Sequence, residues 1–428
     1  MTNSEIVGVR GRRVWDSRGR PTVEAEVILA GGAVGRAIAP AGASTGSGEA
    51  VDRRDGGTAF GGLDVMGAVG AVDGEIATAL KGMDAADQAA VDTAMIVLDG
   101  TPNKSRLGGN ALIAVSLAVA HAHAAALGVP LWKALAGDNP VQLPLPEIQL
   151  FGGGAHAARR VDIQDFMIVA TGAATFAEAL EMTAEVYRAA GVILAERGNL
   201  AGVADEGGYW PAFDTNEEAL ALTVAAIEKA GFKPGEDVSI SLDIAATEFS
   251  TGDGYRLARD SRDLDRAALI ELLLGWVARY PIVSIEDPLA EDDEAGMIAF
   301  TQAAGPRLQI VGDDFLVTNA DRVRHAAAVG ACNAVLIKPN QAGTLTETKA
   351  ALDAAREAGW GAIVSARSGE TEDVSIVHLA VGWGAKQLKV GSFSRSERMA
   401  KWNEGLRIAD AIGDGSLPPW TAFPWGAA

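Results

Sequence analysis

Hydrophobic and polar residues are arranged differently at the start of the chain and in the long segment that follows. Up to about residue 30 they alternate, as in VEAEVILAGG, which predicts antiparallel strands joined by a turn at Gly31–Gly32. Residues 62–137 are rich in alanine and have helical spacing. Within them, NALIAVSLAVAHAHAAALG predicts a helix that begins near Asn110 and ends at Gly128.

A second pattern begins near residue 140, after the segment GDNPVQLPLPE. Short runs rich in Val, Ile and Leu alternate with helical segments such as TLTETKAALDAAREAGW up to about residue 410. This alternation predicts a parallel α/β barrel with buried strands. We therefore expect a domain boundary near residue 140, with the barrel on its C-terminal side.

Six of the apolar runs end in a charged residue, which matters because barrel enzymes build their sites at the C-terminal rim of the strands. The runs SISLDIAA, PIVSIEDPL and LQIVGDDFL supply the carboxylates Asp243, Glu286 and Asp313. The runs AVLIKPN, AIVSARSGE and QLKVGSFS supply the cations Lys338, Arg367 and Lys389. One acidic strand end alone would be expected to face water, but three in register, followed by a lysine, favour a common site.

The residue types at these strand ends indicate a particular chemistry. Carboxylates without neighbouring Cys or His ligands suit Mg²⁺ better than Zn²⁺, and the cations beyond them suit an anionic substrate. A lysine near a metal and another cation can have its pKa lowered toward neutrality, so Lys338 is a candidate base for a proton next to a carboxylate. Metal charge would stabilise the resulting enediolate.

The composition limits the classes of partner that the chain is expected to bind. The 428 residues carry a formal net charge of -20, which argues against nucleic acid or an anionic membrane as the main partner. The start has no apolar core of signal-peptide length, and no uninterrupted apolar run reaches about 18 residues. The one cysteine, Cys332, has apolar neighbours and is expected to be a buried packing residue. A cytoplasmic enzyme is expected.

Three loop features are weaker candidates. Glu206, in VADEGGYW, could donate a proton to a leaving hydroxyl or could be a turn residue only. His156, in GGGAHA, could reach a ligand because its neighbours are small, although a lone loop histidine is more often at the surface. The stretch GASTG at 42–46 could fold a hydroxyl over a phosphate or a metal.

Taken together, these segments resemble the enolase family along nearly the whole chain. The matching motifs are VWDSRGRPTVE, GASTG, LDGTPNKS, VDIQDFM, ADEGG, SIEDPLAEDD, VGDDFLVTN, LIKPNQAGTLTET, SGETED and GSFSRSERMAKWN. The resemblance implies a modified (β/α)8 barrel over residues 139–428, capped by a smaller α+β domain over residues 1–138. It also implies a small anionic phospho- or phosphono-substrate, two Mg²⁺ ions per site, and a homodimer or homo-octamer.

The resemblance also implies roles for individual residues. Lys338 would remove the C2 proton of a 2-phosphoglycerate-type substrate, and Glu206, partnered by Asp165, would help to expel the 3-hydroxyl. Metal ligands would be Asp243, Glu286 and Asp313 for the first Mg²⁺ and Ser44, on a mobile loop, for the second. Substrate contacts would come from Arg367 and Ser368 on the phosphate, Lys389 on the carboxylate, and His156 and Gln164 in the pocket lining.

Several residues depart from the usual motifs of the family. Asp165 stands where IQEFM has Glu, and Ala366 stands where SHRSGETED has His. The segment QLFGGG replaces NIINGG, so that Gly152 takes the place of Asn, and Gly48 replaces a His of the first loop. The pair before VDIQ, usually Asn-Asn, is Arg159-Arg160.

These departures lie around the expected substrate. Smaller residues at positions 366, 152 and 48 are expected to enlarge the pocket or loosen its lid. The side chains of Arg159 and Arg160 could favour a larger or more anionic ligand, or could belong to a solvated loop.

The favoured hypothesis from the sequence is therefore a specialised paralogue. It would keep proton abstraction and β-elimination but make a phosphonate analogue of phosphoenolpyruvate, as carboxyphosphonoenolpyruvate synthases do. The alternative is an ordinary enolase with tolerated substitutions, because the three metal carboxylates, the base, the acid and both anion-binding cations remain. A non-catalytic scaffold is a remote third reading, which the retained Lys338 and metal ligands oppose.

Overall fold

Three antiparallel strands open the chain. The computed structural model describes residues 2–426, and its first sheet has the order β1-β2-β3. The strands are β1 (Ile6–Trp15), β2 (Pro21–Leu29) and β3 (Val34–Ile38). Gly32 has a positive φ of 86° in the turn before β3, a conformation that favours glycine. The predicted antiparallel strands and their turn are confirmed.

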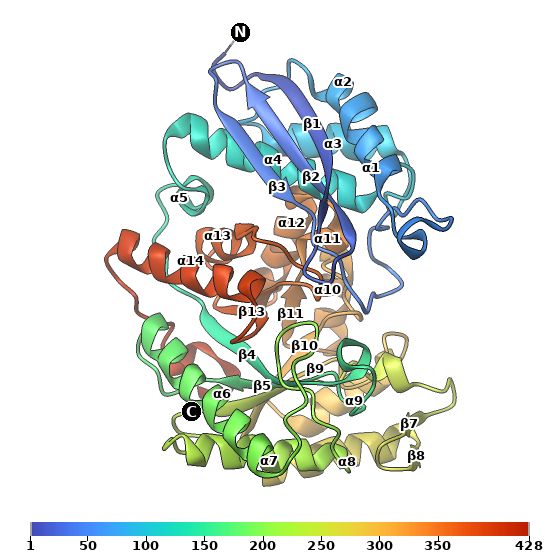
Figure 1. Ribbon diagram of the computed structural model, residues 1–428, viewed down its shortest axis with the longest axis vertical. Helices are drawn as coiled ribbons and strands as arrows, with labels where there is room; N and C mark the ends of the chain where they lie inside the picture. The colour runs from blue at the N-terminus through green and yellow to red at the C-terminus, as the bar shows by residue number, and fades with distance from the viewer. Residues whose placement is uncertain (1, 427–428) are drawn as a thin grey trace.

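Helices cover one side of this sheet (Figure 1). They are η1 (Ala59–Gly62), α1 (Met66–Ala71), η2 (Val72–Ile76), α2 (Ala77–Leu80), α3 (Gln88–Asp99), α4 (Gly109–Leu127) and α5 (Leu131–Ala136). The predicted helix is α4, which packs against β2 and β3. Gly35 of β3 allows a close approach, because a Cβ there would collide with the backbone of Ala118 and Ala122. By length and composition α4 could cross a membrane, but 72% of its most apolar window is buried inside the structure.

The C-terminal part forms a closed barrel of eight strands, in the order β10-β11-β12-β13-β4-β5-β6-β9. Those strands are β4 (Leu145–Gly152), β5 (Asp165–Val169), β6 (Ser239–Asp243), β9 (Ile282–Glu286), β10 (Gln309–Gly312), β11 (Ala334–Ile337), β12 (Gly361–Ser365) and β13 (Gln387–Ser392). A two-stranded ribbon, β7 (Tyr255–Leu257) and β8 (Arg262–Leu264), lies outside it. The predicted barrel with an N-terminal α+β domain is confirmed.

One strand gives the barrel its modified form. β5 runs antiparallel to both of its neighbours, β4 and β6, whereas the other pairs are parallel. The connection from β4 to β5 contains only the short 3-10 turn η3 (Gly154–Ala157) and no crossover helix, so the chain reverses direction. As a result β5 begins, rather than ends, at the rim, and Asp165 lies there beside Asp243 of β6.

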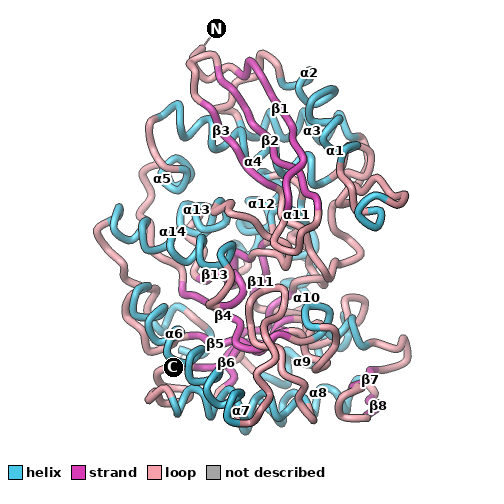
Figure 2. Tube along the Cα trace, viewed as in Figure 1, coloured by secondary structure: helices cyan, strands magenta, loops and turns pink. Residues whose placement is uncertain are grey.

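Helices surround the barrel, as the cyan segments in Figure 2 show. They are η4 (Ala246–Phe249), α6 (Phe176–Glu196), α7 (Asn216–Lys229), α8 (Arg266–Arg279), α9 (Glu294–Ala304), α10 (Ala320–Val329), α11 (Pro339–Ala342), α12 (Leu345–Glu357), α13 (Ser375–Gly382) and α14 (Ser396–Ile412). Six of them begin where a side-chain oxygen accepts a backbone N–H of the first turn, a strong helix-start signal. These N-caps are Thr175, Thr215, Asp265, Asp293, Asn319 and Thr344.

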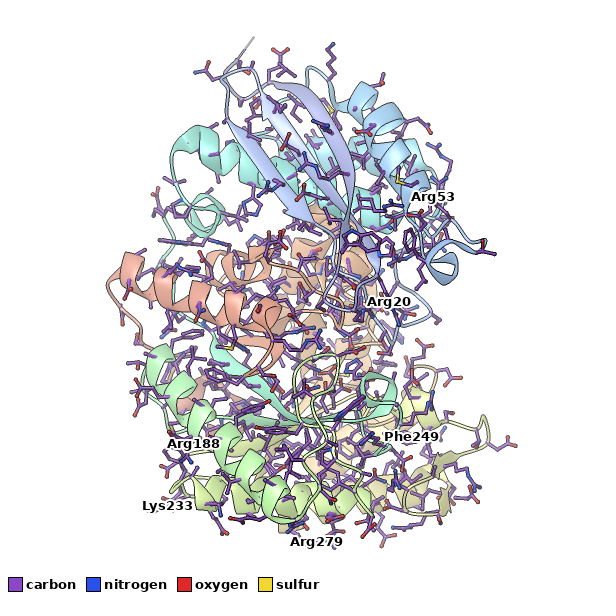
Figure 3. All side chains as sticks on the ribbon, viewed as in Figure 1. Arg20, Arg53, Arg188, Lys233, Phe249 and Arg279 are labelled. Carbon is purple, nitrogen blue, oxygen red and sulfur yellow. The ribbon has the colours of Figure 1, made fainter. Side chains whose placement is uncertain are left out.

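Charged side chains on these helices face outward. Figure 3 labels Arg188 on α6, Lys233 after α7 and Arg279 on α8 at the surface of the barrel domain. Each pairs with a carboxylate, namely Glu185, Glu236 and Glu217. Pairs this exposed contribute little to stability, so the charges chiefly keep this surface solvated.

We call the N-terminal end of the barrel the floor. Its interior contains a pair of buried amide side chains, which are polar but carry no charge. Gln309 of β10 and Gln387 of β13 each donate a hydrogen bond to the other, at 2.7 and 3.1 Å. Both side chains are buried, so each amide satisfies a group that water cannot reach. Cys332, elsewhere in the barrel, is buried and forms no disulfide, as expected from its apolar neighbours.

Candidate active site

Strand ends and two loops meet at the C-terminal rim, beneath the N-terminal domain. A small cavity there has only about 10 Å³ of free volume, which is room for about one water molecule. Eleven predicted site residues line it: Ser44, His156, Gln164, Asp165, Glu206, Asp243, Lys338, Ala366, Arg367, Ser368 and Lys389. Glu286 and Asp313 lie next to the cavity, because each accepts a hydrogen bond from one of its lysines.

Two buried lysines hold the predicted metal carboxylates. The Nζ of Lys389 donates to Asp243 at 3.0 Å and to Glu286 at 2.7 Å, and these two acids face each other across β6 and β9. The Nζ of Lys338 donates to Asp313. Gln341 donates to the other oxygen of Asp313 at 2.9 Å. The three carboxylates therefore share one rim, as their positions at strand ends predict.

The donor set fits a hard divalent cation. Asp243, Glu286 and Asp313 are almost fully buried, and Glu286 Oε1 has no hydrogen-bond partner. Burial, together with the charges of Asp243 and Asp313, raises the pKa of Glu286 well above its usual range. An all-oxygen set that is short of positive charge is suited to Mg²⁺. Beside it, the ligand atoms of Asp287, Asp313 and Asp314 lie within 4.8 Å of one another.

Lys338 differs from the sequence-based expectation in its protonation. Burial lowers the pKa of Lys338, but the charges of Asp313 and Glu286 together raise it above its ordinary value. The predicted lowering assumed a cation close to the lysine, whereas here its nearest partner is an anion. Without a metal ion beside it, Lys338 therefore forms an ion pair with Asp313.

Across the barrel from β11, the strand that precedes Lys338, a second cluster is formed by His156, Asp165 and Glu206. The Nδ1 of His156 lies 3.6 Å from Asp165 Oδ1 and 3.8 Å from Glu206 Oε1. Burial lowers the pKa of His156, but the charges of Glu206 and Asp165 raise it to about 8. Gln164 donates to Asp243 at 3.1 Å, which joins this cluster to the carboxylates under Lys389. The predicted acid and its partner are thus adjacent.

Arg367 is enclosed by the loop over residues 42–50. Its guanidinium contacts Glu49 Oε2 at 2.9 Å, the carbonyl of Ser44 at 2.9 Å, and Asn340 at 3.1 Å. Beside it, Ser368 accepts a hydrogen bond from Arg18 at 3.3 Å. An anionic ligand that reaches Arg367 must therefore compete with Glu49, so this loop controls access to the arginine.

Sequence reasoning missed three buried residues of the site, namely Glu49, Gln341 and Gln149. Glu49 follows the glycine-rich loop that was singled out, and Gln341 follows Lys338 by three residues, so proximity in sequence could have found both. Gln149 donates to Asp165 and accepts from the backbone N–H of Gly208. Its signal in the sequence was the replacement of NIINGG by QLFGGG, which puts Gln149 in place of an Asn.

Arg159 and Arg160 are not brought to the cavity, which corrects the expectation that they contact the ligand. Arg159 pairs with Glu248 at 2.9 Å and is largely exposed. Arg160 lies 4.7 Å from the ring centre of Trp210 and donates to its carbonyl at 3.2 Å. Their charges hold the surface loop together instead.

Two of the small residues do not enlarge the pocket, contrary to expectation. A Cβ on Gly152 would lie 2.6 Å from the Cβ of Ala204, so Ala204 already takes that space. A Cβ on Gly48 would lie 2.5 Å from the guanidinium of Arg322. Ala366 does line the cavity, but the cavity remains small. The structure therefore shows compensated packing rather than extra room.

A closed barrel that sets a buried lysine and paired carboxylates opposite a histidine–carboxylate cluster belongs to the class of acid–base barrel enzymes. Comparison with known proteins gives the family. Residues 6–135 match the family described as "Enolase, N-terminal domain", and residues 140–418 match "Enolase, C-terminal TIM barrel domain". The chain belongs to the enolase family, and it is an enzyme of the carbon–oxygen lyase class.

Two curated relatives extend over nearly the whole chain. "Enolase" of Rubrobacter xylanophilus is 48% identical over 417 residues, which is 97% of this chain and 97% of that protein. "Enolase 1" of Desulfitobacterium hafniense is 47% identical over 422 residues, which is 98% of this chain and 97% of that protein. The prediction of a phosphonate-making paralogue is wrong, because relatives this similar along the whole chain are enolases.

Proposed function

We propose that the chain is an ordinary glycolytic enolase, which interconverts 2-phosphoglycerate and phosphoenolpyruvate with Mg²⁺. The arrangement of the rim supports this most directly. Lys338 follows β11 and Asp165 begins β5, two strands that face each other across the closed barrel, so the lysine and the acidic cluster line one cavity from opposite sides. Such a placement suits the removal of a proton on one side of a substrate and the departure of a hydroxyl on the other.

In this proposal Lys338 takes the proton from C2, and Glu206 gives a proton to the leaving 3-hydroxyl. Asp165 and His156 orient Glu206, since both lie beside it. Arg367 and Ser368 bind the phosphate after Glu49 releases the guanidinium. Lys389 and Gln164 lie next to Asp243 and complete the lining on the carboxylate side.

Asp243, Glu286 and Asp313 would hold one Mg²⁺, and Ser44 would join a second. Mg²⁺ bound there would supply positive charge for an enediolate, and it would compete with Lys338 for the carboxylate of Asp313. The unpartnered Glu286 Oε1 and the all-oxygen donor set support this assignment.

Three wider expectations accompany the proposal. The chain would divide into a capping domain over residues 1–138 and a barrel domain over residues 139–428, which is compatible with the two family matches. It would act in the cytoplasm. It would form a homodimer or homo-octamer, and neither nucleic acid nor membrane would be a partner, in keeping with the net charge of -20.

The proposed activity can be tested with the purified chain, 2-phosphoglycerate and Mg²⁺, by following the enol product. We expect rapid turnover that stops on chelation of the metal and returns when Mg²⁺ is restored. Absence of turnover of 2-phosphoglycerate by a folded, Mg²⁺-loaded sample would overturn the proposal.

A further inference from the structure

The side-chain amide of Gln149 makes two contacts that fix its orientation. A backbone N–H can only donate, so the amide oxygen must be the atom that faces Gly208, 2.8 Å away. The amide nitrogen therefore faces the other way and donates to Asp165 Oδ1. Gln149 is only 1% exposed, so water does not compete for either hydrogen bond.

Two glycines form the walls around this amide. A Cβ on Gly208 would lie 2.5 Å from Gln149 Oε1, and a Cβ on Gly152 would lie 3.3 Å from Gln149 Nε2. Ala204 closes the far side of Gly152. The amide of Gln149 therefore has little space to shift into if a neighbouring side chain is lengthened or displaced.

The amide also joins two separate pieces of the acid–base cluster. Asp165 lies at the first residue of β5, whereas Gly208 belongs to the turn that carries Glu206. The same turn is tied to β4 by a hydrogen bond from the Tyr209 N–H to the Leu150 carbonyl at 3.0 Å. On its other side, the Ser392 N–H donates to the carbonyl of Glu206 at 2.9 Å.

We infer that Gln149 is a positioning residue, which sets the separation between Asp165 and the turn bearing Glu206 by the length of its side chain. This inference rests on the proposed function, in which Glu206 is the acid. Gln149 does not line the cavity and acts only through these two neighbours.

The inference predicts that the lengths of residues 149 and 165 must match. Asp165→Glu adds one C–C bond, about 1.5 Å, and pushes the carboxylate into an amide that cannot retreat. Gln149→Asn shortens the amide by the same length, so that it no longer reaches both partners. Each single change should lower kcat about tenfold or more, because small misplacements near reacting groups are costly. The double variant should restore the bridge.

The decisive experiment compares kcat and KM for 2-phosphoglycerate in the two single variants and the double variant. We expect the double variant to recover kcat to within about threefold of the wild type, with KM nearly unchanged throughout, since Arg367 and Ser368 are untouched. A double variant no better than the worse single variant would overturn the inference. Gln309→Met is the matched control, because it removes an equally buried amide from the floor.

Hydrogen exchange gives a second measurement that does not depend on turnover. Gln149→Met removes the acceptor of the Gly208 N–H, so exchange across residues 204–209 should accelerate, whereas Gln309→Met should leave that segment unchanged. Unchanged exchange in Gln149→Met would contradict the inference, even if the shorter variant failed to fold. A wild type without turnover would refute the proposed function alone, and exchange would still decide the role of Gln149.

Discussion

The two ends of the barrel bury polar side chains in different ways. On the floor, Gln309 and Gln387 satisfy each other and carry no charge. On the rim, Asp313 follows β10 and Lys389 lies on β13, and the carboxylate of Glu286, which accepts a hydrogen bond from Lys389, keeps one oxygen without a partner. A neutral matched pair is a structural solution, whereas crowded charges with unmet contacts indicate a site for a ligand.

Of the changes that test this comparison, the largest effect on catalysis is expected from a substitution on the rim. Lys338→Ala removes the proposed base and should lower kcat by about 10³-fold or more, a loss typical of general bases. The fold should persist, because Lys338 contributes one ion pair and the backbone of β11 is unaffected. Steady-state kinetics and a melting curve measure both effects. Near-normal kcat in this variant would remove Lys338 from the reaction.

The next effect concerns the metal. Saturating Mg²⁺ should raise the melting temperature of the wild type, because binding only to the folded state adds about 2.7 kcal/mol at a hundred times Kd. In Glu286→Gln most of that increase should vanish. Asp263→Asn, an exposed carboxylate on β8, should keep it and serves as the control. An equal Mg²⁺ effect in Glu286→Gln would exclude Glu286 as a ligand.

A change on the floor should affect stability without affecting catalysis. Gln309→Met leaves Gln387 buried without its partner, which should cost about 1–3 kcal/mol of unfolding free energy. Denaturant unfolding measures the loss, and kcat measured well below the melting temperature should stay near the wild-type value. A large fall in kcat would contradict the claim that the floor serves stability and the rim serves catalysis.

The smallest effect is a pH dependence of stability from His156. Its pKa is raised in the fold to about 8, so its charged form stabilises the fold fully below about pH 6.5 and this contribution disappears as pH rises through 8. The difference in stability between the wild type and His156→Gln, measured without Mg²⁺, should therefore shrink by about 2 kcal/mol between pH 6 and 9. A constant difference would show that His156 is neutral in the fold.

Much of the fold and rim could be predicted from the sequence, because strands and their end residues leave a local signal. Asp243, Glu286 and Asp313 each close an apolar run, and parallel strands bring such ends together. Asp165 was identified by the resemblance alone, since it begins a reversed strand and no strand-end pattern marks it.

The remaining errors concern contacts between segments far apart in the chain. Arg159 forms an ion pair with Glu248, and Arg322 fills the space beside Gly48. No local sequence pattern could show either contact. Departures from the family motifs were therefore interpreted one by one as extra space. In the structure, the shorter acid Asp165 accepts a hydrogen bond from Gln149, the longer amide that stands where NIINGG has its first Asn.

The assignment of Lys338 as base and Glu206 as acid is tested most directly by exchange of the C2 proton of 2-phosphoglycerate with D₂O. With Mg²⁺ present, Glu206→Gln should still exchange this proton while forming little product, because Lys338 remains as base. Lys338→Ala should show neither exchange nor product. Exchange that persists in Lys338→Ala, or that disappears in Glu206→Gln while Lys338 is intact, would contradict the assignment of base and acid to opposite sides of the cavity.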